Sequence, residues 1–313
     1  MRDDILSTLE ALHVKTNVPI GLMLKRIGLS WSRYRDWKRR FGVANKHNGR
    51  IPRDFWLEPW EVLAILSFKK NYPAIGYRRL SYMMLDENIV AVSPSTTYRV
   101  LRLYGLTSRW KNNSSGSKRK GFVQPNRPHE HWHTDISYIN FHGTFLFLIS
   151  VLDGFSRFVV HHELRTSMQE YDVQVVLQRA LEKYPHERPR LITDNGSQFL
   201  ALDFIKFLRE TNLRHVRTSV NHPQANGKIE AWHKTIKNEC IRQESLLSLE
   251  DARRIVGEYI DEYNYNRLHS AIGYIAPYDK LCGRADEIFQ ARDQRLEAAR
   301  KRRRKNWEKK KKS

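Results

Sequence analysis

A nearly continuous apolar run, Phe145–Asp153, limits the folds open to this chain more than any other feature. The run is too short to span a bilayer and predicts a strand that is buried on both faces. Four further strands are predicted, at Trp132–Asn140, Arg157–Leu164, Arg190–Asp194 and Arg214–Ser219. The helical spacing of apolar residues predicts helices over Gln169–Tyr184, Leu202–Glu210 and Asn226–Arg242. The order of these elements indicates an α/β fold with one mixed five-stranded sheet flanked by helices.

The first hundred residues have the pattern of two all-α, helix-turn-helix modules, at 1–50 and 51–107. Gly28 and Ser30 form a turn before a basic helix, and Ser93 with Pro94 can cap a later one. Basic second helices of such modules contact DNA. The candidate DNA-binding residues are Arg33, Arg35, Lys38, Arg39 and Arg40 in the first module, and Arg78, Arg79 and Arg99 in the second. The alternative is that each unit is only a small helical packing module.

Residues 108–127 lose the apolar pattern and are predicted to be a basic flexible linker. Its Lys118, Arg119 and Lys120 are further candidates for DNA contact. The catalytic α/β core is expected at 128–245 and a C-terminal helical region at 246–299, with an amphipathic helix over Leu249–Tyr265. A basic helix is expected from Leu296 onward, ending in a basic tail at 300–313.

The 313 residues include 55 Lys and Arg against 34 Asp and Glu, a formal net charge of +21. An excess of this size points to a polyanion as partner, and nucleic acid is the leading class. The charge resides in the helical modules, the linker and the tail, whereas 128–299 carries −3. Two Cys residues that lie far apart suggest neither a disulfide framework nor a zinc site. Without a secretory signal or an apolar span, the expected location is the cytosol, in association with the nucleoid.

Three carboxylates stand where the predicted sheet would bring them together. Asp135 lies in the first strand, Asp194 ends the fourth, and Glu230 lies on the helix that follows the fifth. An acid at the carboxyl end of a buried strand faces the crevice in which α/β sheets bind ligands. Several such acids suit Mg²⁺ or Mn²⁺, and two ions would clamp the attacking and leaving oxygens of a phosphodiester. Each acid alone is also explained by turn or cap chemistry, and Asp153 is assigned to an exposed turn.

The spacing of the acids separates them from ordinary turn residues, because 35 residues lie between Asp194 and Glu230. The acids and the segments around them resemble the DD(35)E signature of retroviral-integrase-like transposases. The segments are Trp-His-Thr-Asp, Asp-Asn-Gly and His-Pro-Gln-Ala-Asn-Gly-Lys-Ile-Glu. The chain is similar, more narrowly, to the second-reading-frame transposase of bacterial insertion sequences of the IS-three family. Gly76-Tyr-Arg-Arg-Leu and the segment that begins at Tyr263-Asn-Tyr-Asn-Arg extend this resemblance over nearly the whole chain.

The resemblance implies a ribonuclease-H-like fold and a Mg²⁺-dependent polynucleotidyl transferase with Asp135, Asp194 and Glu230 as metal ligands. In that mechanism an activated water frees a 3′-hydroxyl at an element end, and the hydroxyl then attacks another phosphodiester. Family members are expected to circularise the element before they insert it. The implied partners are double-stranded DNA at element ends and target, a homo-oligomer on DNA, and a protein from the upstream reading frame.

The helix that carries Glu230 fits this role, because Lys234 and Lys237 follow on the same face and can bind phosphates. Ile229, Trp232 and Ile236 are expected to face the core. An ordinary solvated face explains the two lysines equally well. Asn195, His222 and Asn226 flank the acids and are candidates to position DNA, with turn chemistry as the alternative. For Arg267 and His269 the choice is between DNA contact and capping of a helix C-terminus.

Two other functions remain compatible with the sequence. A catalytically silent DNA-binding regulator derived from a transposase would keep the helical modules without using the acids. A metal-dependent nuclease would hydrolyse DNA without joining strands. The acids with their spacing favour the transposase, which binds element ends and catalyses strand cleavage and strand transfer.

Overall fold

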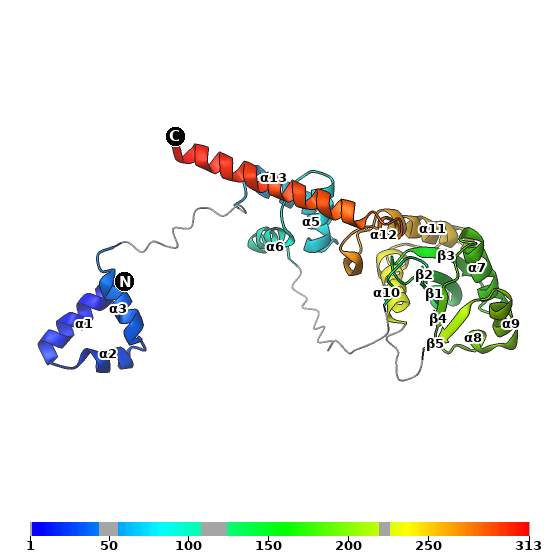
Figure 1. Cartoon of the computed structure of the whole chain (residues 1–313), viewed down its shortest axis with the longest axis horizontal. Coiled ribbons are helices and arrows are strands. Elements are labelled where there is room, and N and C mark those ends of the chain that lie inside the picture. Colours follow the sequence, from blue (N-terminus) through cyan, green and yellow to red (C-terminus); the bar gives the residue numbers. More distant parts are fainter. Residues whose placement is uncertain (1, 44–55, 108–123, 219–225, 313) are drawn as a thin grey trace. The chain divides into compact units, whose positions relative to one another are not determined.

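The computed structural model describes residues 2–43, 56–107, 124–218 and 226–312. The chain divides into two compact units, Met1–Arg53 and Asp54–Ser313 (Figure 1). In the first unit, α1 (Arg2–Thr16), α2 (Ile20–Arg26) and α3 (Trp31–Arg39) enclose a small core. Ser30 caps α3 by accepting a hydrogen bond from the backbone N–H of Arg33 at 3.4 Å. Gly28 has φ +68°, which lets the chain turn sharply between α2 and α3.

The second unit begins with three helices, α4 (Pro59–Asn71), α5 (Tyr77–Asp86) and α6 (Pro94–Leu103). They enclose a core that includes Ile65, Leu80, Met84 and Leu101. Ser93 caps α6, with its Oγ accepting from the N–H of Thr96, and Pro94 occupies the first turn, as the sequence predicts. We call α4–α6 the helical module.

A five-stranded sheet follows, with the order β3-β2-β1-β4-β5. Its strands are β1 (His131–Phe141), β2 (Thr144–Asp153), β3 (Val159–Arg165), β4 (Arg190–Thr193) and β5 (Arg214–Arg217). The first three pair antiparallel, and β4 and β5 run parallel to β1. This mixed topology with helices on both faces confirms the predicted ribonuclease-H-like fold class. Each strand lies within two residues of its predicted bounds.

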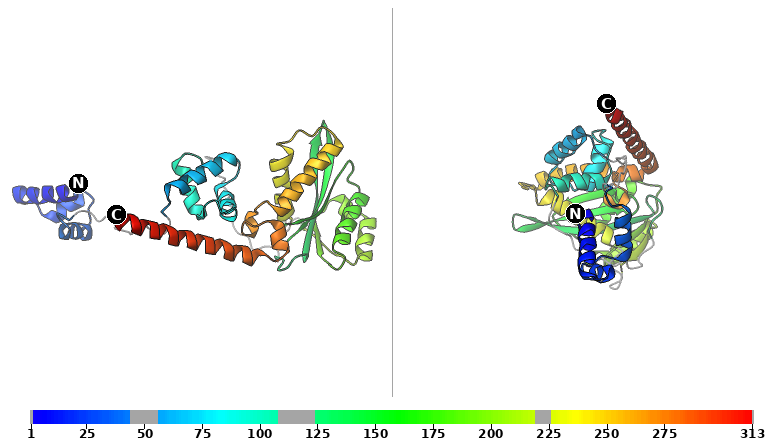
Figure 2. Two further views of the ribbon diagram at one scale, coloured as in Figure 1. Left: turned by 90° about the horizontal axis from the view of Figure 1, so that it is seen from above. Right: turned by 90° about the vertical axis from the view of Figure 1, so that its left-hand side faces the viewer.

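Helices cover the two faces of the sheet (Figure 2). On one face lie α7 (Glu170–Lys183), α8 (Ser197–Leu200) and α9 (Leu202–Glu210), which pack with Trp132 and Val151 in one core. On the other face lie α10 (Gly227–Ile236), the π-helix η2 (Lys237–Ile241) and α11 (Leu249–Tyr265). The buried Ile229, Trp232 and Ile236 of α10 join this second core, which confirms the face predicted for them. Successive β1 residues therefore alternate between two cores.

The chain ends in η3 (Ser270–Ile272), α12 (Pro277–Leu281) and α13 (Ala285–Lys312). The last helix begins eleven residues before the predicted start at Leu296. Its Arg292 forms a bidentate pair with Asp86 at 2.8 and 2.6 Å, and Arg303 pairs with the fully buried Glu61 at 2.9 Å. The predicted basic tail is thus in part a structural element that contacts α4, and the preceding part of the same helix contacts α5. Within the described ranges, no helix is long and apolar enough to cross a membrane.

Candidate active site

Asp135 and Asp194 lie side by side on neighbouring strands. The parallel pairing of β1 with β4 ends at His133 and Ile192, and each aspartate stands two residues beyond that pair. Both carboxylates are partly buried, and each has one oxygen held by a nearby backbone N–H. Ile136 donates to Asp135 at 2.8 Å and Gly196 donates to Asp194 at 2.9 Å. The sheet therefore holds two fixed acids at one place, as the sequence predicts.

The charge of Asp135 acts on its neighbour. Burial and the negative charge of Asp135 raise the pKa of Asp194 above its usual range, although the hydrogen bond from Gly196 opposes them. Two carboxylates that cannot easily ionise together are stabilised when a cation joins them. The pair thus has the electrostatic character of a divalent-cation site.

Glu230 lies on α10, on the wall of an open pocket of about 420 Å³. The same pocket is lined by Lys234 and Lys237, so the three side chains share one face as their spacing predicts. The opposite wall is Ile136–Tyr138 of β1, next to Asp135. Glu230 itself is exposed to solvent. An acid and two cations therefore face a space large enough for part of a nucleotide chain.

His233 connects this pocket to the aspartates and is not among the predicted site residues. It is buried one turn after Glu230, and its Nδ1 lies 3.5 Å from Oδ2 of Asp135. The helical spacing from Glu230 is the only sequence signal that could have found it. Among the described residues, no three His, Cys, Asp or Glu side chains are close enough together to hold a metal ion. The structure thus pairs Asp135 with Asp194 and leaves Glu230 on the adjacent helix.

Known proteins are similar to this chain over the part that holds the sheet. Two family models, both described as "Integrase core domain", match residues 125–223 and 211–277. The transposase for IS904 of Lactococcus lactis is 29% identical over 192 residues, which cover 58% of this chain and 76% of the relative. The transposase InsD for IS2 of Escherichia coli is 29% identical over 229 residues, covering 68% and 75%. The chain is therefore similar to insertion-sequence transposases, and its middle part matches the integrase core domain.

A further transposase is similar to this chain over a longer stretch of sequence. The transposase for IS629 of Shigella sonnei is 23% identical over 269 residues, covering 82% of this chain and 90% of the relative. Among solved structures, a simian T-cell lymphotropic virus intasome in complex with a PP2A regulatory subunit covers 70% of this chain and 74% of its own. Its TM-score is 0.46 at 14% identity. The similarity to IS2 fits the narrower IS-three family.

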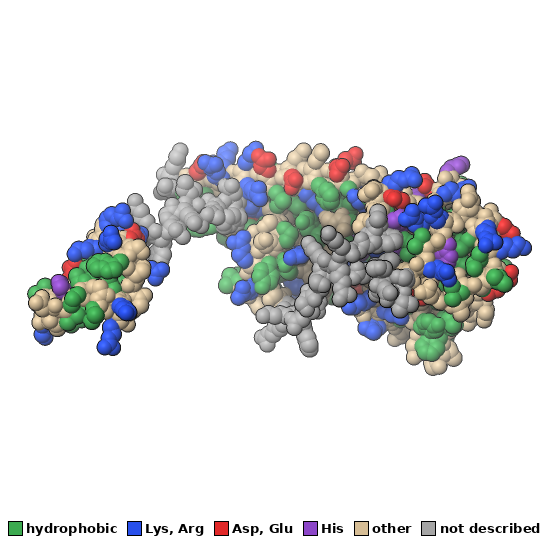
Figure 3. Space-filling model, turned by 60° about the horizontal axis from the view of Figure 1, so that its bottom comes forward, with side chains coloured by type: hydrophobic (Ala, Val, Ile, Leu, Met, Phe, Trp, Pro, Cys, Tyr) green, Lys and Arg blue, Asp and Glu red, His purple; other side chains and the backbone are tan. Residues whose placement is uncertain are grey.

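The candidate DNA contacts of the first unit lie on α3. Arg33 and Arg35 are exposed there, and Lys38 pairs with Glu10 of α1 at 2.8 Å. Arg39 and Arg40 both contact Asp36. Figure 3 shows Lys and Arg side chains on the visible face of each unit. The basic surface of α3 is therefore partly neutralised by Glu10 of α1 and by Asp36 of α3 itself.

The candidates in the helical module differ from one another. Arg78 and Arg99 are exposed, and Arg78 donates from Nε to the hydroxyl of Tyr77 at 3.1 Å. Arg79 instead points at Glu239 of η2, at 3.7 Å. This contact ties Arg79 to the catalytic domain and leaves a quarter of its side chain exposed, 24%. Lys118, Arg119, Lys120 and His222 lie outside the described residues.

Asn195 and Asn226 flank the acids, and both have local structural surroundings. Asn195 donates from Nδ2 to the carbonyl of Thr218 at 2.8 Å, which links the end of β4 to the end of β5. Asn226 is buried directly before α10. The contact of Asn195 agrees with the turn chemistry that the sequence left open as the alternative, whereas the side chain of Asn226 makes no capping hydrogen bond to α10.

Asp153 is not in an exposed turn, so that prediction is wrong. Its side chain is fully buried and accepts hydrogen bonds from the N–H of His129 at 2.9 Å and from the N–H and hydroxyl of Ser156 at 2.7 and 2.6 Å. Arg157 follows with φ +68°, so the chain turns back before β3 begins. The carboxylate of Asp153 is thus occupied by hydrogen bonds within a buried turn. It stays outside the candidate site for this reason, and not because it is exposed.

The segment after α11 uses its polar residues structurally. Nδ1 of His269 accepts a hydrogen bond from the N–H of Ala271 at 3.2 Å and so caps η3. Arg267 pairs with Glu239 at 2.6 Å. His269 therefore caps the N-terminus of η3 and not the C-terminus of a helix, and Arg267 forms an ion pair.

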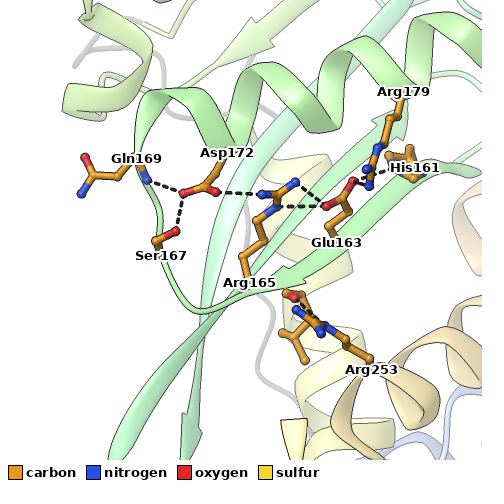
Figure 4. Close-up of polar contacts among 9 residues, drawn as sticks. His161, Glu163, Arg165, Ser167, Gln169, Asp172, Arg179 and Arg253 are labelled. Atoms are coloured by element: carbon orange, nitrogen blue, oxygen red, sulfur yellow. Dashed lines mark hydrogen bonds and ion pairs between the residues drawn. The ribbon is translucent and has the colours of Figure 1, made fainter. Parts of the chain in front are cut away.

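A second cavity of about 520 Å³ lies between the end of β3, the start of α7 and α11. Its arginines are already paired (Figure 4). Arg165 contacts Glu163 at 2.7 Å and Asp172 at 3.0 Å, and Arg179 contacts Glu163. Arg253 donates to the carbonyl of Leu164 at 3.2 Å. Because two of these arginines are held by carboxylates and the third by a carbonyl, we assign the cavity to the framework.

Proposed function

We infer that the chain is a DNA transposase that binds element ends and catalyses strand cleavage and strand transfer, the polynucleotidyl transferase activity that its family implies. The observation that carries this inference is the pair Asp135 and Asp194, held beside each other on β1 and β4 and next to the pocket of Glu230. The matches to the integrase core domain support the same reaction class.

We propose Asp135, Asp194 and Glu230 as the ligands of Mg²⁺ or Mn²⁺, with two ions in the complete site. The raised pKa of Asp194 beside Asp135 supports a cation between them. When bound, such ions would act as Lewis acids on the phosphodiester and lower the pKa of a coordinated water. The protein itself fixes the aspartates through backbone N–H groups and supplies Glu230 from the rigid face of α10. Because Glu230 is exposed, its approach to the aspartates is expected to accompany metal and DNA binding.

DNA would be held by basic residues around the acids and in the helical parts. Lys234 and Lys237 face the same pocket as Glu230 and are placed to bind phosphates beside the reacting bond. We keep the following residues as candidate DNA contacts: Arg33, Arg35, Lys38, Arg39, Arg40, Arg78, Arg79, Arg99, Lys118, Arg119, Lys120, Asn195, His222 and Asn226. We also propose the division into modules at 1–50 and 51–107, a linker at 108–127, a core at 128–245, a helical region at 246–299 and a tail.

The proposed partners are double-stranded DNA at element ends and at the target, further copies of this chain on DNA, and an upstream-reading-frame protein. A bacterial cytosolic, nucleoid-associated location follows from this activity. A regulator without catalysis and a nuclease without joining are the competing functions. Each of the three predicts different products from the same reaction.

The test is a cleavage and joining assay with purified protein, Mg²⁺ and labelled DNA that carries the ends flanking the gene. The transposase predicts both cleaved and joined strands, and Asp194→Asn loses both. Cleaved strands without joined strands would identify a nuclease. Binding without any cleavage, or full activity of Asp194→Asn, would overturn the proposal.

A further inference from the structure

Glu239 lies where three parts of the second unit meet. Its carboxylate accepts two hydrogen bonds from Arg267, from Nε at 2.7 Å and from Nη2 at 2.6 Å. The hydroxyl of Tyr259 on α11 donates to it at 3.1 Å. Arg79 on α5 of the helical module places Nη2 3.7 Å from the same carboxylate. One acid of η2 is therefore shared by α5, by α11 and by the segment that follows α11.

The pair of Glu239 with Arg267 is the strongest of these contacts. Bidentate pairing fixes both the distance and the orientation of the two groups. Only 11% of the Arg267 side chain is exposed, and its guanidinium lies over the ring of Tyr263, 5.5 Å from the ring centre. Burial acts to raise the pKa of Glu239, but the hydrogen bond from Arg267 and the charges of Arg267 and Arg79 lower it below its usual range. The carboxylate is thus held ionised between two arginines.

The same surroundings hold the helix that carries Glu230. Residues Gly227–Ile236 run into η2 while the backbone stays helical at Ile236 and Lys237. Trp232 of α10 packs on Tyr259 and Tyr263, with ring centres 6.4 and 4.5 Å apart. These are the two tyrosines that contact Glu239 and Arg267. A shift at Glu239 would therefore be transmitted along a packed helix toward Glu230. π-turns inside helices occur frequently at functional sites.

The helical module reaches this cluster through Arg79. Burial and the charge of Arg267 lower the pKa of Arg79, and Glu239 opposes them. The carboxylate of Glu239, 3.7 Å away, is the counter-charge that favours Arg79 in this position. A second contact lies nearby, because Tyr82 of α5 stacks on Tyr274 with ring centres 5.0 Å apart. The orientation of α5 is thus tied to η2 through Arg79 and to the segment after η3 through Tyr82.

We propose that Glu239 is a positioning residue that couples the helical module, through Arg79, to the placement of Glu230 on α10. This inference rests on the proposed function, in which the helical module contacts DNA and Glu230 acts in catalysis. When DNA binds to the module, its effect on the position of α5 is transmitted to Glu230 through Arg79, Glu239 and α10. Glu239 does not touch DNA in this account.

Hydrogen exchange in the full-length protein tests the coupling without depending on catalysis. DNA carrying the ends that flank the gene is added, and exchange is followed in peptides that span Gly227–Ile241. Wild-type protein should become about tenfold more protected in this segment when DNA binds. Glu239→Gln should lose that response, and so should Arg79→Ala, which leaves the bidentate pair with Arg267 intact. Glu258→Gln, which alters an exposed contact with Arg254 on α11, is the matched control and should respond as wild type.

Rates give a second readout. At saturating DNA, Glu239→Gln should slow cleavage by about 10- to 100-fold through misplacement of Glu230. Its affinity for DNA should stay within about twofold of wild type, a change under about 0.5 kcal/mol. If Glu239→Gln and Arg79→Ala keep the wild-type exchange response, the coupling is wrong even if the chain is a transposase. If wild type shows the response but never cleaves DNA, the proposed function fails while the coupling stands.

Discussion

Asp135 and Asp194 stand at equivalent points of two parallel strands, each two residues past the last backbone pair that joins β1 to β4. The strands therefore fix the separation of the two carboxylates before any ligand arrives. Their mutual repulsion is visible in the raised pKa of Asp194, to which burial contributes most. The repulsion between the two carboxylates lowers the stability of the free protein, and a bound cation would relieve it.

This relationship predicts opposite effects of Asp194→Asn with and without metal. Without metal, the variant loses a repelled charge, so its melting temperature should equal or exceed that of wild type. Saturating Mg²⁺ should stabilise wild type by about 2–3 kcal/mol when present at about 100 times its Kd, and should leave the variant unchanged. Thermal unfolding followed by circular dichroism measures both effects. An equal Mg²⁺ response in the two proteins would remove Asp194 from the metal site.

Glu61 should be needed to stabilise the contact between α4 and α13. Its side chain is fully buried and faces Arg303 at 2.9 Å and Arg302 at 2.8 Å. Glu61→Gln leaves the buried Arg303 without its counter-charge, and the expected cost is about 3 kcal/mol in urea unfolding. The control is Glu297→Gln, which alters an exposed pair with Lys301 and should cost at most about 0.5 kcal/mol. If both variants lose the same free energy of unfolding, the buried pair contributes no more to stability than the exposed one.

His269 predicts a loss of stability in acid. Burial and the charges of Arg267, Arg157 and Arg79 lower the pKa of His269 to about 4, against the weaker opposing effect of Glu239. Below pH 6.5 the unfolded chain therefore binds a proton that the folded chain does not, and the free energy of unfolding falls by about 1.4 kcal/mol per pH unit until pH 4. Urea unfolding between about pH 7 and pH 5 measures the slope. In His269→Asn the amide oxygen can still accept a hydrogen bond from Ala271, but the free energy of unfolding should depend less steeply on pH. An unchanged pH dependence would mean that other groups cause it.

The exposed basic residues near the C-terminal end of α13 should bind DNA electrostatically. Lys305 and Lys309 are exposed there, whereas Arg303 is buried against Glu61. Changing both lysines to Gln keeps the helix in place. The slope of log K for DNA binding against log salt concentration should become less steep by about 0.9 for each DNA phosphate that the lysines no longer neutralise. Fluorescence anisotropy over a salt series measures the slope. If the slope does not change, these lysines are only solvated.

The sheet and its acids could be predicted because their signals are local. Apolar runs such as Phe145–Asp153 mark strands that are buried on both faces, and the spacing of Glu230 with Lys234 and Lys237 marks one helix face. The pairing of Asp135 with Asp194 follows once two parallel strands are placed side by side. Predictions of this kind need no knowledge of distant contacts.

The parts that sequence reasoning misses depend on contacts between distant segments. The early start of α13 is supported by Arg292, which pairs with Asp86, 206 residues away along the chain. Arg267 is a candidate for DNA contact in the sequence because its partner Glu239, 28 residues away, carries no sequence signal. Asp153 is expected to be exposed because an Asp-Gly pair usually marks a surface turn, but its hydrogen bonds bury it.

The most direct test of the central claim is metal specificity at a single atom of the substrate. DNA is prepared with sulfur in place of the 3′ oxygen that leaves at the cleaved bond, and cleavage is measured in Mg²⁺ and in Mn²⁺. If metal held by Asp135, Asp194 and Glu230 contacts that oxygen, the sulfur substrate should be cleaved poorly in Mg²⁺ and much faster in Mn²⁺, because Mn²⁺ binds sulfur better. Normal DNA should show no such difference. Equal cleavage of the sulfur substrate in both metals would contradict metal-assisted chemistry at this site.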